Sequence, residues 1–196
     1  MASIDVSKVL VGAPDQAVTG AISDAPVGTE LPTDATSQMG GAFKSSGYVS
    51  DDGLELTTDR STNDIHDWSG ANIRKILKSF DSTLAWSEAQ MSYESLCHAF
   101  GSENVTREPA NAQHGERVTL RVNASLPAAR SWVFSMKDGD ARIRIVVPNG
   151  QVTSVDTIAF NSSDAITLPI TLSCYPDVSG NSIYIYVDDG KVGVGA

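Results

Sequence analysis

Hydrophobic and polar residues alternate along much of the C-terminal half of the chain. The alternation has a period of two in five stretches, at residues 117–123, 131–136, 142–147, 170–175 and 183–187. This period, with one apolar face, is typical of antiparallel strands that are buried on one side. Turn signals lie between or after the stretches, at Asp138-Gly139, Asn149-Gly150, Ser179-Gly180 and Asp189-Gly190. The alternation breaks between Val152 and Val155, which predicts a β-bulge there.

Residues 72–80 fit two kinds of element. Their apolar side chains recur at helical spacing, at Ile73, Ile76, Leu77 and Phe80. The segment then runs directly into Leu84 and Trp86, which alternate with small or polar residues as in a strand. The pattern alone leaves helix and strand open for this segment.

A single helix is predicted over residues 88–100. Ser87 is a suitable N-cap, Gln90 completes a capping box, and Gly101 provides a C-terminal stop. One face of this helix is apolar and consists of Ala89, Tyr93, Leu96, Cys97 and Phe100. A one-sided apolar stripe packs against a flat surface, most simply a sheet. The predicted fold class is therefore mainly β, an antiparallel β-sandwich or partly open barrel with one flanking α-helix.

The first third of the chain is less regular. Short apolar runs at residues 8–11 and 18–22, with Pro14 and Asp15 between them, are compatible with a hairpin or two edge strands. Residues 23–47 are rich in Gly, Pro, Ser, Thr and Asp without a clear period, and strand-like positions resume over residues 48–68. We expect a long loop at about 23–67 within a single domain of residues 1–196, since loops of this length usually have a function or are disordered.

Acidic residues are concentrated in the same part of the chain. The sequence has 24 Asp and Glu against 14 Lys and Arg, a formal net charge of −10. Residues 1–67 hold 11 acidic and three basic side chains, a balance of −8, so residues 68–196 contribute −2. Nucleic-acid binding proteins normally show a basic face. We also expect neither a signal peptide nor a membrane span, because no apolar stretch reaches the length of about 20 residues that a span needs.

Side chains that could carry chemistry are few and scattered. The histidines are His66, His98 and His114, and we expect His98 to have a capping or surface role on the predicted helix. The acidic run at residues 51–53, with Glu55, lacks the ligand spacing of a calcium loop. We therefore expect no catalytic residue, no cofactor and no metal site, and the chain is not expected to be an enzyme.

Two further features allow more than one interpretation. Cys97 and Cys174 are either two buried thiols or one disulfide that closes a long loop. A basic stripe would form if two of the predicted strands pair, and its members are Arg117, Arg121, Arg142 and Arg144. Such a stripe is more typical of a solvated sheet face than of a nucleic-acid site.

A β-protein with a long loop and few reactive groups is suited to assembly. Unpaired strand edges are prone to pair with other chains, and in a closed ring of subunits they become the joints. A loop that cannot order alone can order between neighbouring subunits by burying apolar side chains. The candidate inter-subunit contacts of this kind are Leu31, Met39, Phe43, Tyr48 and Leu54.

Five short segments stand in a defined order along the chain. They are APVGTELP at 25–32, GYVSDDG at 47–53, IHDWSG at 65–70, PNGQV at 148–152 and PDVSG at 176–180. In this order they resemble the major tail protein, or tail tube protein, of long-tailed (siphovirus-type) bacteriophages. The resemblance covers nearly the whole chain. Some relatives carry an additional C-terminal immunoglobulin-like domain, and we expect none in this chain.

The resemblance implies both a fold and a function. Family members are β-sandwiches with one flanking helix, and they form hexameric rings that stack into the tail tube, the conduit for DNA during ejection. The inner sheets of six subunits join into one barrel, while long loops and terminal arms reach neighbouring subunits and rings. The resemblance also implies that residues 72–86 form a strand. It implies a homo-oligomer with tape measure and tail terminator proteins as partners, DNA that passes without specific binding, no membrane, and a virion tail protein made in the host cytoplasm.

This resemblance gives the negative charge two alternative roles. Acidic side chains that face the channel would repel passing DNA within a Debye length of about 8–10 Å. Alternatively, they keep the unassembled subunit soluble. Inter-ring contact is a further option for the acidic residues Asp51, Asp52, Glu55 and Asp59.

Two other functions stay open at this stage. A β-sandwich module that binds sugar or protein ligands would need exposed aromatic residues in one groove, for which Trp68, Tyr184 and Tyr186 are candidates. A tail terminator or head-decoration protein would be another virion assembly protein, separated from a tube protein by ring stoichiometry and self-polymerisation.

Overall fold

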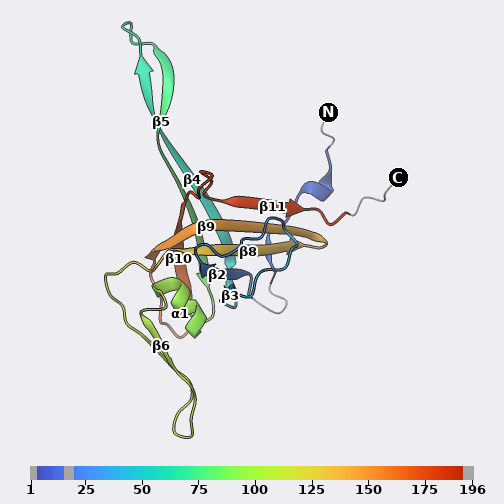
Figure 1. The fold of residues 1–196 in the computed structure, drawn as a ribbon, viewed down its shortest axis with the longest axis vertical. Helices are drawn as coiled ribbons and strands as arrows, with labels where there is room; N and C mark the ends of the chain where they lie inside the picture. Colours follow the sequence, from blue (N-terminus) through green and yellow to red (C-terminus); the bar gives the residue numbers. More distant parts are fainter. Residues whose placement is uncertain (1–3, 16–19, 192–196) are drawn as a thin grey trace.

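The computed structural model describes residues 4–15 and 20–191, which form mainly antiparallel strands (Figure 1). Its elements in chain order are η1 (Val6–Lys8), β1 (Ala13–Pro14), β2 (Ile22–Pro26), β3 (Lys44–Ser45), β4 (Val49–His66), β5 (Asn72–Glu88), α1 (Tyr93–Phe100), β6 (Val105–Glu108), β7 (Arg117–Leu120), β8 (Arg130–Asp138), β9 (Ala141–Val155), β10 (Leu168–Tyr175) and β11 (Tyr184–Asp188). Nine of these described strands form one sheet in the order β3-β2-β8-β9-β10-β5-β4, with β1 paired to β8 and β11 paired to β9. Strands β6 and β7 form a separate pair. The predicted fold class, mainly β with an antiparallel β-sandwich or partly open barrel and one flanking α-helix, is confirmed, since the described residues form an antiparallel sheet that is not closed into a barrel, with one α-helix.

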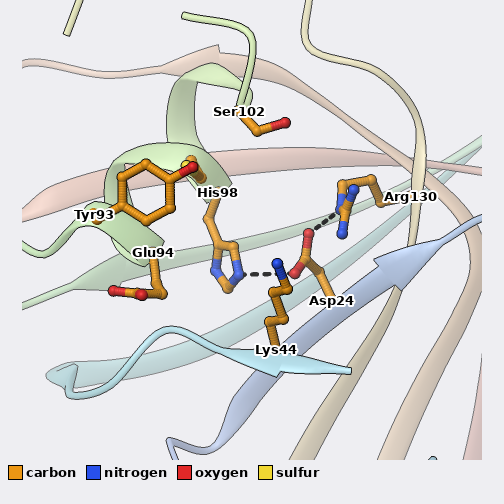
Figure 2. A pocket seen from close by; sticks show the side chains of 8 residues that line it. Asp24, Lys44, Tyr93, Glu94, His98, Ser102 and Arg130 are labelled. Carbon is orange, nitrogen blue, oxygen red and sulfur yellow. Dashed lines mark hydrogen bonds and ion pairs between the residues drawn. The ribbon is translucent and has the colours of Figure 1, made fainter. Parts of the chain in front are cut away.

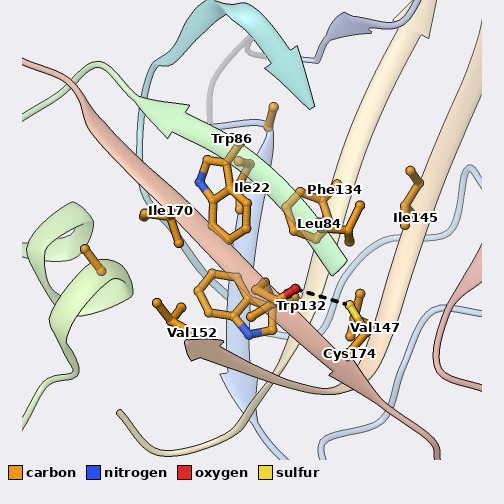
Figure 3. Packing of buried hydrophobic residues seen from close by; sticks show 13 residues of the cluster. Ile22, Leu84, Trp86, Trp132, Phe134, Ile145, Val147, Val152, Ile170 and Cys174 are labelled. Carbon is orange, nitrogen blue, oxygen red and sulfur yellow. Dashed lines mark hydrogen bonds between the residues drawn. The ribbon is translucent and has the colours of Figure 1, made fainter. Parts of the chain in front are cut away.

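One side of the large sheet carries the hydrophobic core. Leu84 and Trp86 of β5 pair with Leu172 and Ile170 of β10, and all four side chains are buried. The aromatic residues Trp86, Trp132 and Phe134 meet at this core (Figure 3), where the rings of Trp86 and Trp132 have centroids 5.4 Å apart. We call this side of β4, β5 and β10 the core face. The alternating residues between the buried ones point the other way and form the open face.

The β-bulge predicted between Val152 and Val155 is confirmed. Thr171 of β10 pairs with Ser154 of β9, whereas the next residue, Leu172, pairs with Val152. Thr153 is therefore the extra residue on β9. The insertion restores Val152 to the core face, where it is buried.

Strands β4 and β5 form a long hairpin that extends well beyond the core (Figure 1). The open question over residues 72–80 is settled as strand. The helical spacing of its apolar residues is explained by a β-bulge. Ser79 pairs with Ser61 and Leu77 pairs with Thr62, so Lys78 is an extra residue on β5. This bulge places Leu77 and Phe80, three residues apart, on the same side of the hairpin.

The predicted helix is shorter than expected at its N-terminus, and the prediction of Ser87 as its cap is wrong. Strand β5 continues to Glu88 because Leu84, Trp86 and Glu88 alternate into the core. Ser92 is the N-cap, since its hydroxyl accepts a hydrogen bond from the backbone N–H of Ser95 at 3.1 Å. The helix ends at Gly101 as predicted, with φ of 84°. No helix among the described residues is long and apolar enough to cross a membrane.

The segment expected as a loop at 23–67 is largely structured, and this prediction is corrected. Strand β2 extends to Pro26 and β4 begins at Val49, so that the irregular part is confined to residues 27–43 and a short link before β4. Of the apolar run at 18–22, Val18 and Thr19 lie outside the described residues. The buried Arg144 of β9 holds the irregular segment, because its guanidinium donates to the backbone carbonyls of Asp34 at 3.1 Å and Ser37 at 2.8 Å.

Replacing Arg144 with methionine is expected to release this loop. The substitution keeps apolar volume but leaves both carbonyls without their donor, so we expect the free energy of unfolding to fall by about 1–3 kcal/mol. Amide hydrogen exchange of residues 33–38 should accelerate. The matched control is Arg142→Met, because the guanidinium of Arg142 donates to the nearby carbonyls of Gly139 and Ala141 and not to the irregular segment. Equal exchange rates in the two variants would contradict this role.

The turn predicted at Asn149-Gly150 is wrong, because both residues continue β9. Gly150 pairs with Arg130 on one side and with Cys174 on the other. A Cβ atom at this position would lie 2.9 Å from a methyl carbon of Leu172 and 3.0 Å from the indole of Trp132. The glycine therefore allows close packing in a strand. The turns at Gly139 and Gly180 are confirmed, with φ of 56° and 81°.

The two open alternatives are also settled. Cys97 and Cys174 are both free thiols, and burial raises the pKa of Cys174 to about 12. The basic stripe does not form, because β7 pairs with β6 in the separate sheet while Arg142 and Arg144 lie on β9 in the large one.

Candidate functional site

The distal hairpin, residues 59–81, projects from the body of the subunit (Figure 1). Its turn is held by Asp67, whose Oδ1 accepts hydrogen bonds from the hydroxyl of Ser69 at 2.7 Å and from the backbone N–H groups of Ser69 and Ala71 at 2.8 and 2.9 Å. These bonds lower the pKa of Asp67. Below the turn, Lys75 and Asp64 form a cross-strand ion pair at 2.7 Å. The hairpin is therefore built to hold its shape away from the core.

One side of the hairpin continues the core face as an apolar stripe, which we define as Leu56, Leu77 and Phe80. All three are 40–57% exposed. The guanidinium of Arg60 lies 4.7 Å from the ring centroid of Phe80 and covers part of it. Isolated two-stranded hairpins are marginally stable in water. The apolar stripe is therefore a surface that another protein surface could cover.

The part of the open face nearest the body of the subunit, at residues 55–59 of β4 and 81–87 of β5, is acidic, whereas Arg74 lies on the same side farther out on the hairpin. The alternation places Glu55 and Asp59 of β4 and Asp81 of β5 on this face, among Thr57, Thr83 and Ala85. All three carboxylates are exposed, and Asp59 pairs directly with Asp81. Beside them, a hollow of about 250 Å³ is lined by residues that include Asp52, Glu55 and Asp156. Between Glu55 and Asp59, and between Asp81 and Ser87, the described open face carries no basic residue.

Within residues 4–15 and 20–191, the sheet ends in a long edge that pairs with no further strand. Strand β4 is the last strand in the sheet order and has 18 residues, with β5 as its neighbour on one side. The opposite margin ends in the two-residue strand β3. Unpaired edges of this length invite pairing with another chain.

The structure separates the apolar residues that were predicted to contact neighbouring subunits. Leu31, Met39 and Phe43 are partly buried in the irregular segment, and Tyr48 is exposed just before β4. Leu54 packs against the core of its own subunit. Contact of the first four residues with a neighbour stays a prediction, whereas Leu54 already has an intramolecular role.

The acidic candidates divide into two groups. Glu55 and Asp59 lie on the open face, whereas Asp51 and Asp52 lie in the irregular start of β4, where the register shifts between Val49 and Leu54. The sequence interpretation did not find the apolar stripe. The sequence indicated it only through the spacing of Leu77 and Phe80, which are three residues apart. In a regular strand such residues would point to opposite sides, and the bulge at Lys78 places them on the same side.

A buried charge cluster joins four elements of the subunit. It consists of Asp24 on β2, Glu88 on β5, His98 on α1 and Arg130 on β8 (Figure 2 shows Asp24, His98 and Arg130). His98 Nε2 lies 3.1 Å from Asp24 Oδ1, and His98 Nδ1 lies 2.9 Å from Glu88 Oε1. Arg130 pairs with the other oxygen of Asp24. The cluster connects β2, near one margin of the sheet, with β5, next to the other margin.

The expectation that His98 has a capping or surface role is wrong, since only 3% of this residue is exposed. Burial alone would lower the pKa of His98, but hydrogen bonds to Asp24 and Glu88 and the negative charge of both raise it to about 9. Burial acts to raise the pKa of Asp24, but the hydrogen bond and positive charge of His98, with Arg130, lower it. The sequence contains one indication of this cluster. Glu88 continues the alternation of Leu84 and Trp86, so a carboxylate occupies a strand position whose side chain points into the core.

The cluster predicts a defined pH dependence of subunit stability. A raised pKa in the folded state means that the contribution of His98 is complete below its unfolded pKa of 6.5 and is lost as pH rises through about 9. The loss between these values should be about 3 kcal/mol. Asp24 has the opposite sign, so its contribution is lost as pH falls below 3.8.

Urea unfolding between pH 6 and pH 10 measures the effect of His98. A midpoint that stays constant across this range would contradict the ionised cluster. The variant His98→Gln is the control, because its urea midpoint should fall less as pH rises from 6 to 10.

A hollow of about 120 Å³ adjoins the cluster and is lined by residues that include Lys44, Tyr93, Cys97 and Arg130 (Figure 2). Burial raises the pKa of the Cys97 thiol, so it is not an activated nucleophile. No group of three or more His, Cys, Asp or Glu side chains in the described ranges is arranged to hold a metal ion. The cluster is suited to joining the margins of the sheet.

Comparison with known proteins places these surfaces in context. A family described as "Phage tail tube protein" matches residues 8–193. No curated protein matches the chain. Among solved structures, the chain is similar to the cap that terminates the tube of the anti-feeding prophage, with 13% identity, a TM-score of 0.43 and coverage of 95% of this chain and 97% of that chain. It is also similar to a chain of an extracellular contractile injection system, the PVC sheath–tube complex in its extended state, with 11% identity, a TM-score of 0.40 and coverage of 95% and 100%.

Proposed function

The chain belongs to the phage tail tube protein family, and we propose that six copies form a ring and that rings stack into the conduit for phage DNA. The family match over residues 8–193 is the observation that carries this proposal. The protein is a structural component of the virion tail. The tape measure protein inside the tube and the tail terminator protein at its end are partners in the same proposal, and no catalytic residue or cofactor is required.

In this proposal, the two edges of the sheet join neighbouring subunits and close the ring. The free edge of β4 would pair with the β1–β3 margin of the next subunit, and repetition around the ring would give a barrel without free edges. The support for this step is the 18-residue length of β4 and its terminal place in the sheet order. The contact is heterologous, so it closes only when the rotation between copies completes a circle.

In the proposed tube, the open face lines the channel. Its charged residues between Glu55 and Asp59 and between Asp81 and Ser87 are all acidic, and its other residues are small or uncharged. Like charges directly opposite one another destabilise a strand pair, so the Asp59–Asp81 pair is not explained by subunit stability. An acidic lining would repel DNA phosphates, whereas a basic lining would bind them by releasing counterions.

Reversing the charge of the open face should make the tube retain DNA. In the variant Glu55→Lys, Asp59→Lys, Asp81→Lys, we expect assembled tubes to bind short duplex DNA, with an affinity that falls at least about tenfold between 50 and 200 mM salt. The matched control reverses three exposed acids elsewhere, Glu30, Glu103 and Asp164. Co-sedimentation of labelled DNA with tubes measures the difference. Equal retention by the two variants would remove the channel assignment.

The proposed function itself is tested by concentrating the purified full chain. Size-exclusion chromatography and negative-stain electron microscopy over a range of concentrations should show rings and then tubes of constant diameter. Discrete dimers or a single closed ring that never stacks would instead indicate a different virion assembly role.

A further inference from the structure

Trp68 is presented at the tip of the distal hairpin. Its relative exposure is 105%, so the indole is fully in solvent. The turn that carries it is held by the three hydrogen bonds to Asp67 and by Gly70, whose φ of 86° suits glycine. Tryptophan on an ordered support loses little conformational entropy on binding and is enriched among residues that dominate interface energies.

A hollow beside α1 has suitable dimensions and chemistry. It encloses about 230 Å³ between the end of α1, the segment 121–127 and the end of β9. Its apolar lining includes Phe100, Val122, Leu126 and Val155. Val122 and Leu126 are more than half exposed. The helix α1 lies in the lower part of the molecule in Figure 1, far from the hairpin tip at the top.

We propose that Trp68 of one copy inserts into this hollow on a second copy, in the neighbouring ring. The inference rests on the proposed function and names the residues that would join successive rings. Charge complementarity supports the choice of a second copy. Asp67 adjoins Trp68 and places a carboxylate at the tip, where its Oδ1 accepts three hydrogen bonds from Ser69 and Ala71. Arg121 lines the hollow and has no ion pair in the described part of the chain.

The direction of this contact agrees with stacking. It joins two different surfaces of the subunit that lie far apart, so it is heterologous and leaves a free tip at one end and a free hollow at the other end of every stack. Such a contact propagates along an axis. The apolar stripe lies on the same hairpin and would be covered at the same time as the tip engages.

The variant Trp68→Ala tests the anchor in the full chain. We expect the critical concentration for tube formation to rise at least about 30-fold, as for loss of a dominant interface residue. The thermal unfolding midpoint of the unassembled subunit should stay unchanged, because the side chain is fully exposed. Val178→Ala is the matched control, since Val178 is also fully exposed, at 107%, but lies after β10. An unchanged critical concentration in Trp68→Ala would overturn the inference.

A photo-crosslinking amino acid at position 68 identifies the receptor. In assembled tubes, cross-links to Phe100 or to residues 121–127 of a second copy are expected, and Leu126→Asp should raise the critical concentration as Trp68→Ala does. Tubes whose cross-links map elsewhere would overturn the inference while leaving the proposed function intact. If the unaltered chain forms no tubes, both the proposed function and this inference are overturned.

Discussion

Replacing His98 with alanine is expected to lower the free energy of unfolding of the subunit by about 3–5 kcal/mol. The change removes the positive partner that stands between Asp24 and Glu88, while Arg130 still pairs with Asp24. Glu88 is then left fully buried with only the 3.3 Å hydrogen bond from the indole of Trp86. The edge-to-face contact between His98 and Trp132, with centroids 5.0 Å apart, is lost as well.

Urea unfolding followed by tryptophan fluorescence and circular dichroism measures this loss. The control is His66→Ala, because His66 lies exposed at the end of β4 and its removal should change stability by less than about 0.5 kcal/mol. If His98→Ala also changes stability by less than 1 kcal/mol, the cluster does not join the sheet margins as described. The double variant Glu88→Gln, His98→Gln should recover part of the loss, because it removes both charges of the pair.

Placing aspartate at both Leu77 and Phe80 is expected to abolish tube formation while the subunit remains folded. The two side chains form most of the apolar stripe, and burying a charge in their place is unfavourable at any interface that covers them. We expect the critical concentration to rise by more than about 100-fold. Subunit stability should change little, because the distal hairpin lies outside the core clusters.

The control places aspartate on the opposite side of the same hairpin, at Ser61 of β4 and Ser79 of β5. These residues pair with each other, so the two new carboxylates repel one another across the hairpin. The thermal unfolding midpoint of both double variants is therefore measured alongside their assembly. Light scattering and electron microscopy of both variants compare assembly directly. Equal assembly in the two double variants would show that the apolar stripe is not an assembly surface.

Strand content was predictable because period-two alternation is local. The stretches at 131–136, 142–147 and 170–175 all lie within strands, and the bulge at Thr153 follows from a loss of phase within a few residues. The character of residues 72–80 was not predictable in the same way. The bulge at Lys78 is defined by the register against β4, and register is a property of two strands together.

The start of the helix illustrates how tertiary packing overrides a local signal. Ser87 with Gln90 satisfies the requirements of a capping box, yet β5 continues through this position. The reason is the burial of Trp86 and Glu88, whose partners Phe134 and His98 come from β8 and α1. A one-dimensional pattern contains no information on those partners.

For the candidate site, too, local features were predictable from the sequence and features that depend on tertiary contacts were not. The acidic character of residues 51–59 was evident from composition, and pairing with β5 then places Glu55 and Asp59 on one face. The buried charge cluster could not be predicted, because its four residues lie 10 to 106 positions apart. Leu54, expected at an interface, is required by the subunit's own core.

A cryo-EM reconstruction of the concentrated full chain tests the central claim most directly, namely that copies of this chain complete one another's sheet. We expect stacked rings in which β4 of each subunit is hydrogen-bonded to the β1–β3 margin of its neighbour and Glu55, Asp59 and Asp81 border the channel. A protein that remains monomeric at high concentration, or rings in which β4 stays unpaired, would contradict this account.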